Sequence, residues 1–140
     1  DPGNLGTMIR TGEGAGITGV IMNQQTVDIF NPKTIRATMG SIFRVPFVYV
    51  PELSPVLTQM HEKGIHTYAA HLKGQKYYDS FSFREPIAFL IGNEGNGLTK
   101  EISDQAGQYL KIPMEGKVES LNASIAAALL MYEAHRQRNL

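Results

Sequence analysis

Cysteine is absent from the 140-residue sequence, so neither a disulfide framework nor a thiolate metal site can form. The sequence also lacks any apolar run close to the ~20 residues of a membrane-spanning helix. No signal peptide is visible, and the default expectation is a cytoplasmic protein. The four histidines show no spacing typical of metal ligands, so no metal site is expected.

Net charge is missing as well, because 13 Lys and Arg balance 13 Asp and Glu. This balance argues against strong binding of nucleic acid, independent of the nucleic-acid sequence, by this chain alone. No internal repeat, low-complexity tract or interdomain linker interrupts the sequence. A chain of this length is expected to form one domain, residues 1–140, around a single well-buried core.

Short apolar runs alternate with helical patterns along the chain. Strands are expected at residues 18–22, 44–50, 65–70, 87–91 and 109–112. Helices are expected from a cap at Asn4 to Ala15 and at residues 33–39, 54–63, 98–106 and 121–137. Residues 73–82 show no clear period and are expected to form a loop with at most a helical turn. The alternation predicts an α/β fold, a mostly parallel sheet with helices on both faces.

The C-terminal stretch Ile112–Tyr132 carries the strongest local signals. Its strand stops at Pro113, and Ser120 and Asn122 stand where the last helix is expected to begin. Ser and Asn satisfy free backbone N–H groups at such a start. An apolar stripe follows at helical spacing: Leu121, Ile125, Ala128, Leu129 and Tyr132. A strand that ends before a polar helix start is how α/β proteins build ligand sites, although an ordinary capped helix fits equally well.

Two further stretches add to this signal. Residues 1–11 read DPGNLGTMIRT, with Asn4 and Arg10 six positions apart, and residues 87–98 read IAFLIGNEGNGL. Together with IPMEGKVESLNAS, they resemble, in order, the three motifs of the SpoU branch of the SPOUT methyltransferases. These are knotted, S-adenosylmethionine-dependent RNA 2′-O-ribose methyltransferases. Ala123, where the family often has Val, is a mild departure.

The resemblance implies S-adenosylmethionine (AdoMet) as the cofactor and a deep trefoil knot at the C-terminus, which periodicity alone could never justify. By this resemblance the cofactor is held by residues of the second and third motifs. They are Gly92, Asn93, Ile112, Met114 and Leu121. Ile112 and Leu121 could equally be ordinary core residues. Gly92 could equally make only a turn.

The resemblance assigns the substrate side to Arg10, Asn4, Glu94, Ser120 and Asn122. Arginine offers donors but no acceptor while charged, so Arg10 is expected to anchor a phosphate and stabilise developing alkoxide charge. Glu94 is expected to support the site by orienting Arg10, by stabilising its loop or by taking up a proton. The two asparagines and Ser120 could also be helix caps and nothing more.

RNA, either tRNA or rRNA, is the implied partner, and a homodimer is expected from the family. One basic group comprises Lys33, Arg36 and Arg44. A second, between Lys73 and Arg84, includes four aromatic residues and could contact RNA or be an ordinary surface loop. The chain begins within a motif and without Met, so a preceding RNA-binding part is expected.

Two rival functions stay open. The first is a knotted RNA-binding protein without catalysis, which loss of Arg10, Glu94 or the SLN motif would favour; none is lost. The second is a Rossmann dehydrogenase, which needs G-x-G-x-x-G after its first strand. Gly12, Gly14 and Gly16 do not match that pattern, because they lie within or at the end of an expected helix.

Overall fold

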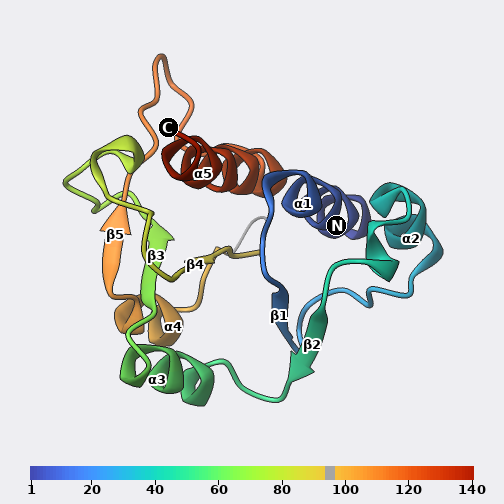
Figure 1. The fold of residues 1–140 in the computed structure, drawn as a ribbon. Coiled ribbons are helices and arrows are strands. Elements are labelled where there is room, and N and C mark those ends of the chain that lie inside the picture. Colours follow the sequence, from blue (N-terminus) through green and yellow to red (C-terminus); the bar gives the residue numbers. More distant parts are fainter. Residues whose placement is uncertain (94–96) are drawn as a thin grey trace.

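The computed structural model describes residues 1–93 and 97–140 (Figure 1). Helices and strands alternate in the following order: α1 Pro2–Ala15, β1 Val20–Asn23, α2 Pro32–Thr38, η1 Ser41–Phe43, β2 Phe47–Val50, α3 Ser54–Glu62, β3 His66–Ala70, η2 Tyr78–Ser80, β4 Ile87–Leu90, α4 Lys100–Gln105, β5 Gln108–Leu110 and α5 Ala123–Arg138. The expected elements are confirmed with shifts of a few residues at their ends. The short 3-10 helix η2 is the helical turn expected within residues 73–82.

The strands are all parallel where they pair, as expected, but they form two sheets instead of one. β1 pairs with β2, and a separate three-stranded sheet has the order β4-β3-β5. Local patterns predict strands without specifying their partners, because pairing is set by contacts far apart in sequence. The α/β class is therefore confirmed, while the prediction of one continuous sheet is wrong for the described residues.

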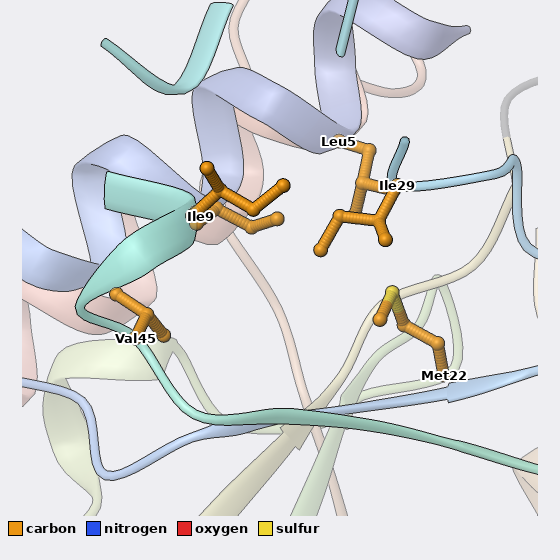
Figure 2. Close-up of a cluster of buried hydrophobic side chains, with 6 residues drawn as sticks. Leu5, Ile9, Met22, Ile29 and Val45 are labelled. Atoms are coloured by element: carbon orange, nitrogen blue, oxygen red, sulfur yellow. The ribbon is translucent and has the colours of Figure 1, made fainter. Parts of the chain in front are cut away.

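Two hydrophobic clusters replace the single core expected from the sequence. The first packs α1 over β1 and the segments around η1 (Figure 2), and comprises Leu5, Ile9, Met22, Ile29, Ile42 and Val45. The second packs α5 against the three-stranded sheet, and comprises Tyr68, Phe83, Leu110, Leu130 and Ala134. α1 and α5 contact each other, so these two helices connect the two clusters.

Helix α1 owes its close packing to its glycines. A Cβ on Gly6 would lie 2.5 Å from both the Cβ of Ala37 and the carbonyl oxygen of Thr34, so α1 and α2 approach here at backbone distance. A Cβ on Gly12 would lie 2.4 Å from Cδ1 of Ile17. These contacts explain why the helix tolerates residues that cost it up to about 1 kcal/mol each in propensity.

An ion pair fastens the end of α1 to η1. The carboxylate of Glu13 accepts hydrogen bonds from Nε of Arg44 at 2.5 Å and from Oγ of Ser41 at 2.6 Å. Arg44, and after it Ser41, lower the pKa of Glu13 from 4.5 to about 2. Because the folded-state pKa is depressed, the contribution of this carboxylate to stability is complete above about pH 4.5 and is lost as the pH falls toward about 2.

We therefore expect the free energy of unfolding to depend less on pH between 4.5 and 2 in Glu13→Gln than in the native protein. Urea titrations across this pH range would measure the difference. Arg44→Gln should remove the same pH-dependent part, since it deletes the main hydrogen-bond donor to Glu13. Parallel pH profiles for all three proteins would contradict the assignment.

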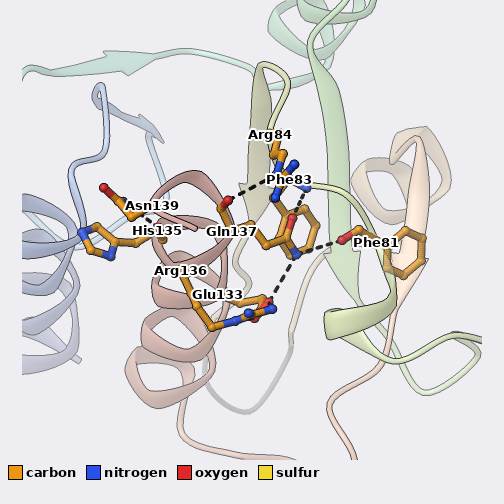
Figure 3. A network of polar contacts seen from close by, with 8 residues as sticks. All are labelled: Phe81, Phe83, Arg84, Glu133, His135, Arg136, Gln137 and Asn139. Atoms are coloured by element: carbon orange, nitrogen blue, oxygen red, sulfur yellow. Dashed lines mark hydrogen bonds and ion pairs between the residues drawn. The ribbon is translucent and has the colours of Figure 1, made fainter.

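Helix α5 buries polar residues against the loop that precedes β4 (Figure 3). The backbone N–H of Phe83 donates to Oε1 of Gln137 at 2.6 Å, and Nε2 of Gln137 donates to the carbonyl of Phe81 at 2.9 Å. Glu133, also buried, accepts from Arg136 at 2.6 Å. Meanwhile Ile125, Leu129 and Tyr132 of the expected apolar stripe are exposed. The stripe is therefore on the outside of α5.

Replacing Gln137 with alanine is expected to lower the free energy of unfolding by about 2–4 kcal/mol, because the buried Phe83 N–H loses its acceptor and two further hydrogen bonds are lost. Urea unfolding followed by circular dichroism would measure it. Gln59→Ala, at an exposed position on α3, should change stability by less than about 0.5 kcal/mol. Equal stabilities of the two variants would show that the network contributes nothing.

Candidate active site

The carboxyl ends of β4, β3 and β5 meet at one edge of the three-stranded sheet. Ala69 pairs with Leu90, and Ala70 pairs with Leu110, so the outer strands end at nearly the same level on either side of β3. Neighbouring strands lie about 4.8 Å apart, which separates the ends of β4 and β5 by about 10 Å. The loops that carry the second and third motifs therefore leave the sheet side by side, as ligand-binding loops do in α/β folds.

The predicted cofactor residues lie in these two loops and at the start of α5. Gly92 and Asn93 follow β4, and Ile112 and Met114 follow β5, while Leu121 lies just before α5. All are half-buried except Asn93, whose side chain is exposed. Half-buried apolar side chains around one sheet edge suit the flat face of a nucleoside, whereas the fully buried positions belong to the two core clusters.

Gly92 is required by the backbone of its own loop. A Cβ at this position would lie 2.3 Å from the carbonyl carbon of Gly97 and 2.3 Å from the backbone nitrogen of Leu98. The loop is closed by a hydrogen bond from Gly97 N–H to the carbonyl of Asn93 at 2.8 Å. Glu94, predicted to support the site, falls in the segment 94–96 and lies outside the described residues.

A polar cluster joins the first and third motifs across 118 residues of sequence. Nδ2 of Asn122 donates to Oδ1 of Asn4 at 3.2 Å. Oδ1 of Asn122 caps α5 by accepting from the N–H groups of Ser124 and Ile125. Ser124 Oγ lies 2.6 Å from Oδ1 of Asn122 and 3.3 Å from Oδ1 of Asn4. The side chain of Asn122 thus both caps a helix and orients Asn4.

The cap reading of Asn4 is wrong, because Asp1 is the N-cap of α1 and accepts from Gly3 N–H at 2.8 Å. Asn4 instead lies in the first turn of α1 and faces the start of α5. Its Nδ2 is buried without a hydrogen-bond partner among the described residues. An unpaired buried donor costs about 1–3 kcal/mol, so a ligand oxygen that accepts from it would bind favourably.

Ser124 was not among the predicted site residues. It is buried and contacts both asparagines, so it fixes the geometry of the pair. The available signal was the spacing within SLNAS, since a serine two residues after an N-cap lies in the first turn of the helix. Ser120, in contrast, is exposed, and the N-cap of α5 is Asn122.

Arg10 is exposed and forms no hydrogen bond or ion pair with any other described residue. Six residues turn an α-helix by about 240° beyond one full turn, so Arg10 and Asn4 project from different sides of α1. The structure therefore joins Asn4 to the third motif but does not bring Arg10 into the same cluster.

A large cleft of ≈ 1310 Å³ lies between the two sheets. Its lining includes β1 and β4, and among the predicted site residues it includes Asn4, Gly92 and Asn93. Ile112 and Leu121 do not line it. The cleft therefore meets the carboxyl edge of the sheet at the loop after β4, and does not extend to the loop after β5.

The aromatic and basic segment 73–84 is largely structural. Phe83 is fully buried, and Phe81 packs edge-on against Tyr68 with ring centroids 5.4 Å apart. Tyr77 is half-exposed, and its backbone bridges to Lys111. Phe83 is therefore inaccessible to RNA and Phe81 is partly covered, whereas the lysines of this segment are exposed.

Residues 1–93 and 97–140 contain no group of three His, Asp or Glu side chains arranged to hold a metal ion. Within the same residues, no helix is both long enough and apolar enough to cross a membrane. That the reaction needs no metal stays a prediction.

Comparisons with known proteins agree on one family. The sequence model of the SpoU rRNA Methylase family matches residues 1–132. The 23S rRNA (guanosine(2553)-2′-O)-methyltransferase RlmP of Bacillus subtilis is 38% identical over 94% of this chain and 53% of its own length. The chain spans about half the length of the curated relatives it matches.

Solved structures give the same picture. An AdoMet-bound rRNA methyltransferase from Sinorhizobium meliloti has a TM-score of 0.88 and 38% identity, over 97% of this chain and 52% of that chain. The SpoU methyltransferase AviRb from Streptomyces viridochromogenes, in complex with AdoMet, has a TM-score of 0.92 and 34% identity, over 99% of this chain and 54% of that chain.

Proposed function

The chain belongs to the SpoU rRNA methylase family, and from this we propose that it transfers a methyl group from AdoMet to a ribose 2′-hydroxyl of tRNA or rRNA. Residues 1–140 would form one catalytic domain. The observation that carries the proposal is the hydrogen bond between Asn4 and Asn122, because it unites the family's first and third motifs in one site. The AdoMet complex of the relative AviRb and the 2′-O specificity in the name of RlmP support the choice of cofactor and target.

AdoMet fits the carboxyl edge of the three-stranded sheet. The loops after β4 and β5 offer backbone groups and half-buried apolar side chains about 10 Å apart, a span that an adenosine can bridge. Ile112, Met114 and Leu121 would contact the adenosine, and the loop Gly92–Asn93 would hold it by main-chain groups. When bound, AdoMet supplies a methyl group on a sulfonium, which needs no further activation.

The protein's own task is to place the ribose and to handle one proton. The 2′-oxygen would form a bond to the methyl carbon as the carbon–sulfur bond breaks, which leaves the neutral thioether, and the hydroxyl proton would pass to Glu94 or to solvent water. Asn4, held by Asn122 and Ser124, has a free Nδ2 donor for a ribose or phosphate oxygen. Arg10, which projects from another side of α1, would hold a phosphate of the bound RNA and stabilise charge on the 2′-oxygen. Glu94 is our candidate for support of this site, and Ser120 for a further substrate hydrogen bond.

Transfer of label from tritiated AdoMet tests this function directly. The substrate is total tRNA or rRNA from a strain that lacks the gene, so that the target site is unmodified. Nuclease digestion followed by mass spectrometry should reveal one 2′-O-methylated nucleoside, and the reaction should survive EDTA. AdoMet binding without transfer to any RNA would instead favour the non-catalytic RNA-binding reading.

We also infer the family's trefoil knot, in which the segment that leads into α5 passes through a loop of the C-terminal half. Support comes from family membership and from the order of the motifs. A chain trace from an experimental map would test it, and a trace without a threaded loop would contradict it. An RNA substrate also favours a cytoplasmic location.

We further propose a homodimer that uses α5. Ile125, Leu129 and Tyr132 are exposed at i, i+4 and i+7, which gives the helix an outward apolar stripe next to the cluster at its start. The apolar face of α1, in contrast, is buried in the first core, which removes it as an interface surface.

We expect sedimentation at micromolar concentration to give about twice the monomer mass of 15.4 kDa. Leu129→Glu should shift the protein toward monomer, because the interface would then bury a charge. Val48→Glu, at a half-exposed apolar position on β2, is the matched control and should stay dimeric. A native protein that sediments as a monomer with full activity would refute the proposal.

A further inference from the structure

A second surface combines exposed apolar side chains with unpaired cations. Met39 is 67% exposed and Phe43 is 86% exposed, the largest exposure among the hydrophobic residues of the described chain. Lys33 and Arg36 are exposed on α2 and form no ion pair with any described residue. We name these four residues the α2–η1 patch.

The patch is displayed by a rigid support. Ser41 is buried and donates to Glu13, and Ile42 is buried in the first core, so η1 is anchored on both sides of its short turn. This anchoring directs Phe43 outward. Met39 has a φ of 51°, and is the one non-glycine residue with positive φ among the described residues. This left-handed residue is the C-cap that ends α2, so the exposed side chain of Met39 lies at the turn into η1.

The charges around the α2–η1 patch indicate which kind of ligand it binds. Residues 29–51 contain Lys33, Arg36 and Arg44 but no Asp or Glu, although the whole chain is neutral. Arg44 is engaged by Glu13, which leaves Lys33 and Arg36 free to bind a polyanion. A two-fold contact between copies of this surface would bring like charges together, which disfavours a second copy as the occupant.

The α2–η1 patch lies close to Arg10, which belongs to the substrate side of the proposed site. On α1, Gly6 packs on Ala37, and Glu13 binds Ser41. Arg10 lies one turn from each of them, and residues three or four apart share a face of a helix. Arg10 therefore emerges beside the turn of α2 and η1 that carries Met39.

We propose that the α2–η1 patch binds a single-stranded segment of the RNA substrate, with one base stacked on Phe43 and the flanking phosphates held by Lys33 and Arg36. This inference rests on the proposed function, because the RNA bound here would be the one whose ribose lies near Arg10. Stacking on an exposed ring tolerates any base, and lysine and arginine hold the phosphates, so the patch supplies affinity and position without reading sequence.

The absence of tryptophan allows a direct optical test. In Phe43→Trp the single indole reports on the patch, and its fluorescence should be quenched on titration with a ten-nucleotide oligouridylate RNA. Tyr77→Trp, half-exposed in the other basic segment, is the matched comparison and should respond less or only at higher RNA concentration. No quenching of Phe43→Trp, or the same half-saturation at both positions, would overturn the assignment.

Affinity measurements give a second, independent readout. Phe43→Ala and Phe43→Leu should each weaken oligouridylate binding by about tenfold, because leucine keeps apolar bulk but not the ring. Lys33→Gln and Arg36→Gln should each reduce the slope of log affinity against log salt by about 0.7. Unchanged affinity in the Phe43 variants, or a loss of dimer mass in sedimentation, would show that the ring serves another contact.

These assays contain no methyl donor, so their failure is distinct from failure of the proposed function. If Phe43→Ala transfers methyl groups and binds RNA with unchanged affinity, the RNA-binding role of the patch is refuted and the proposed catalytic function stands. If RNA binds at Phe43 in a protein that transfers no methyl group, the RNA-binding role of the patch stands and the catalytic proposal is refuted.

Discussion

Arg10→Ala should lose methyl transfer by about 10²–10³-fold while its affinity for AdoMet stays within a few-fold of the native value. The size follows from the removal of a donor that stabilises charge developing in the transition state. The selectivity follows from position, because Arg10 is on an exposed part of α1 and the cofactor residues lie at the edge of the three-stranded sheet. Single-turnover rates at saturating RNA and calorimetric titration with AdoMet measure the two quantities.

Arg10→Lys separates charge from geometry. A lysine keeps the positive charge but cannot present two parallel N–H donors to a phosphate, so this variant should also transfer slowly. Lys63→Ala, an exposed cation beyond the end of α3, is the control for a general loss of positive charge and should keep its rate. Near-native turnover of either Arg10 variant would end the role assigned to this residue.

Gly92→Val should lose AdoMet affinity by at least about a hundredfold. The first added carbon would already stand 2.3 Å from backbone atoms of Gly97 and Leu98, so the loop after β4 must open to accept it. The backbone groups that are proposed to hold the cofactor would then be displaced. Calorimetry measures the affinity, and thermal unfolding shows whether the fold survives.

Gly92→Ala keeps this prediction testable where the valine variant unfolds, because it introduces the same clash with the least added volume. Gly64→Ala is the control. Gly64 has a φ of 76° and no atom within 4 Å of an added Cβ, so its replacement strains the backbone far from the site. We expect Gly64→Ala to lose some stability and no affinity. If Gly92→Ala binds AdoMet as tightly as the native protein, the loop plays no part in binding.

Much of the fold could be predicted because its signals are local. Gly16 has a positive φ and ends α1, whereas α2 ends at Met39 in the left-handed conformation, one residue before Gly40. Asn31 caps α2, and Asn122 caps α5, a role that its position before the last helix predicted. The division into two sheets could not be predicted, because strand pairing depends on contacts far apart in sequence.

The candidate site could be predicted only in part, because some of its features also depend on contacts between residues far apart in the sequence. Periodicity located the apolar stripe of α5 without revealing that it faces outward, because Glu133 and Gln137 occupy the buried face. Those two polar residues are buried at low cost since the backbone of Phe81 and Phe83 satisfies Gln137, and Arg136 pairs with Glu133. The contact of Asn4 with Asn122 also depends on packing between the two ends of the chain.

The two separate hydrophobic clusters have a consequence for heat inactivation. Asn4 belongs to the helix of one cluster, and Asn122 and Ser124 begin the helix of the other. Amide protons in β2 and β3 can therefore exchange with solvent through separate cooperative openings. Any opening that parts α1 from α5 breaks the asparagine pair while both clusters stay folded. Catalysis would then fail at a lower temperature than the one at which the secondary structure melts. RNA that bridges the two halves would raise the temperature of catalytic failure toward this melting temperature.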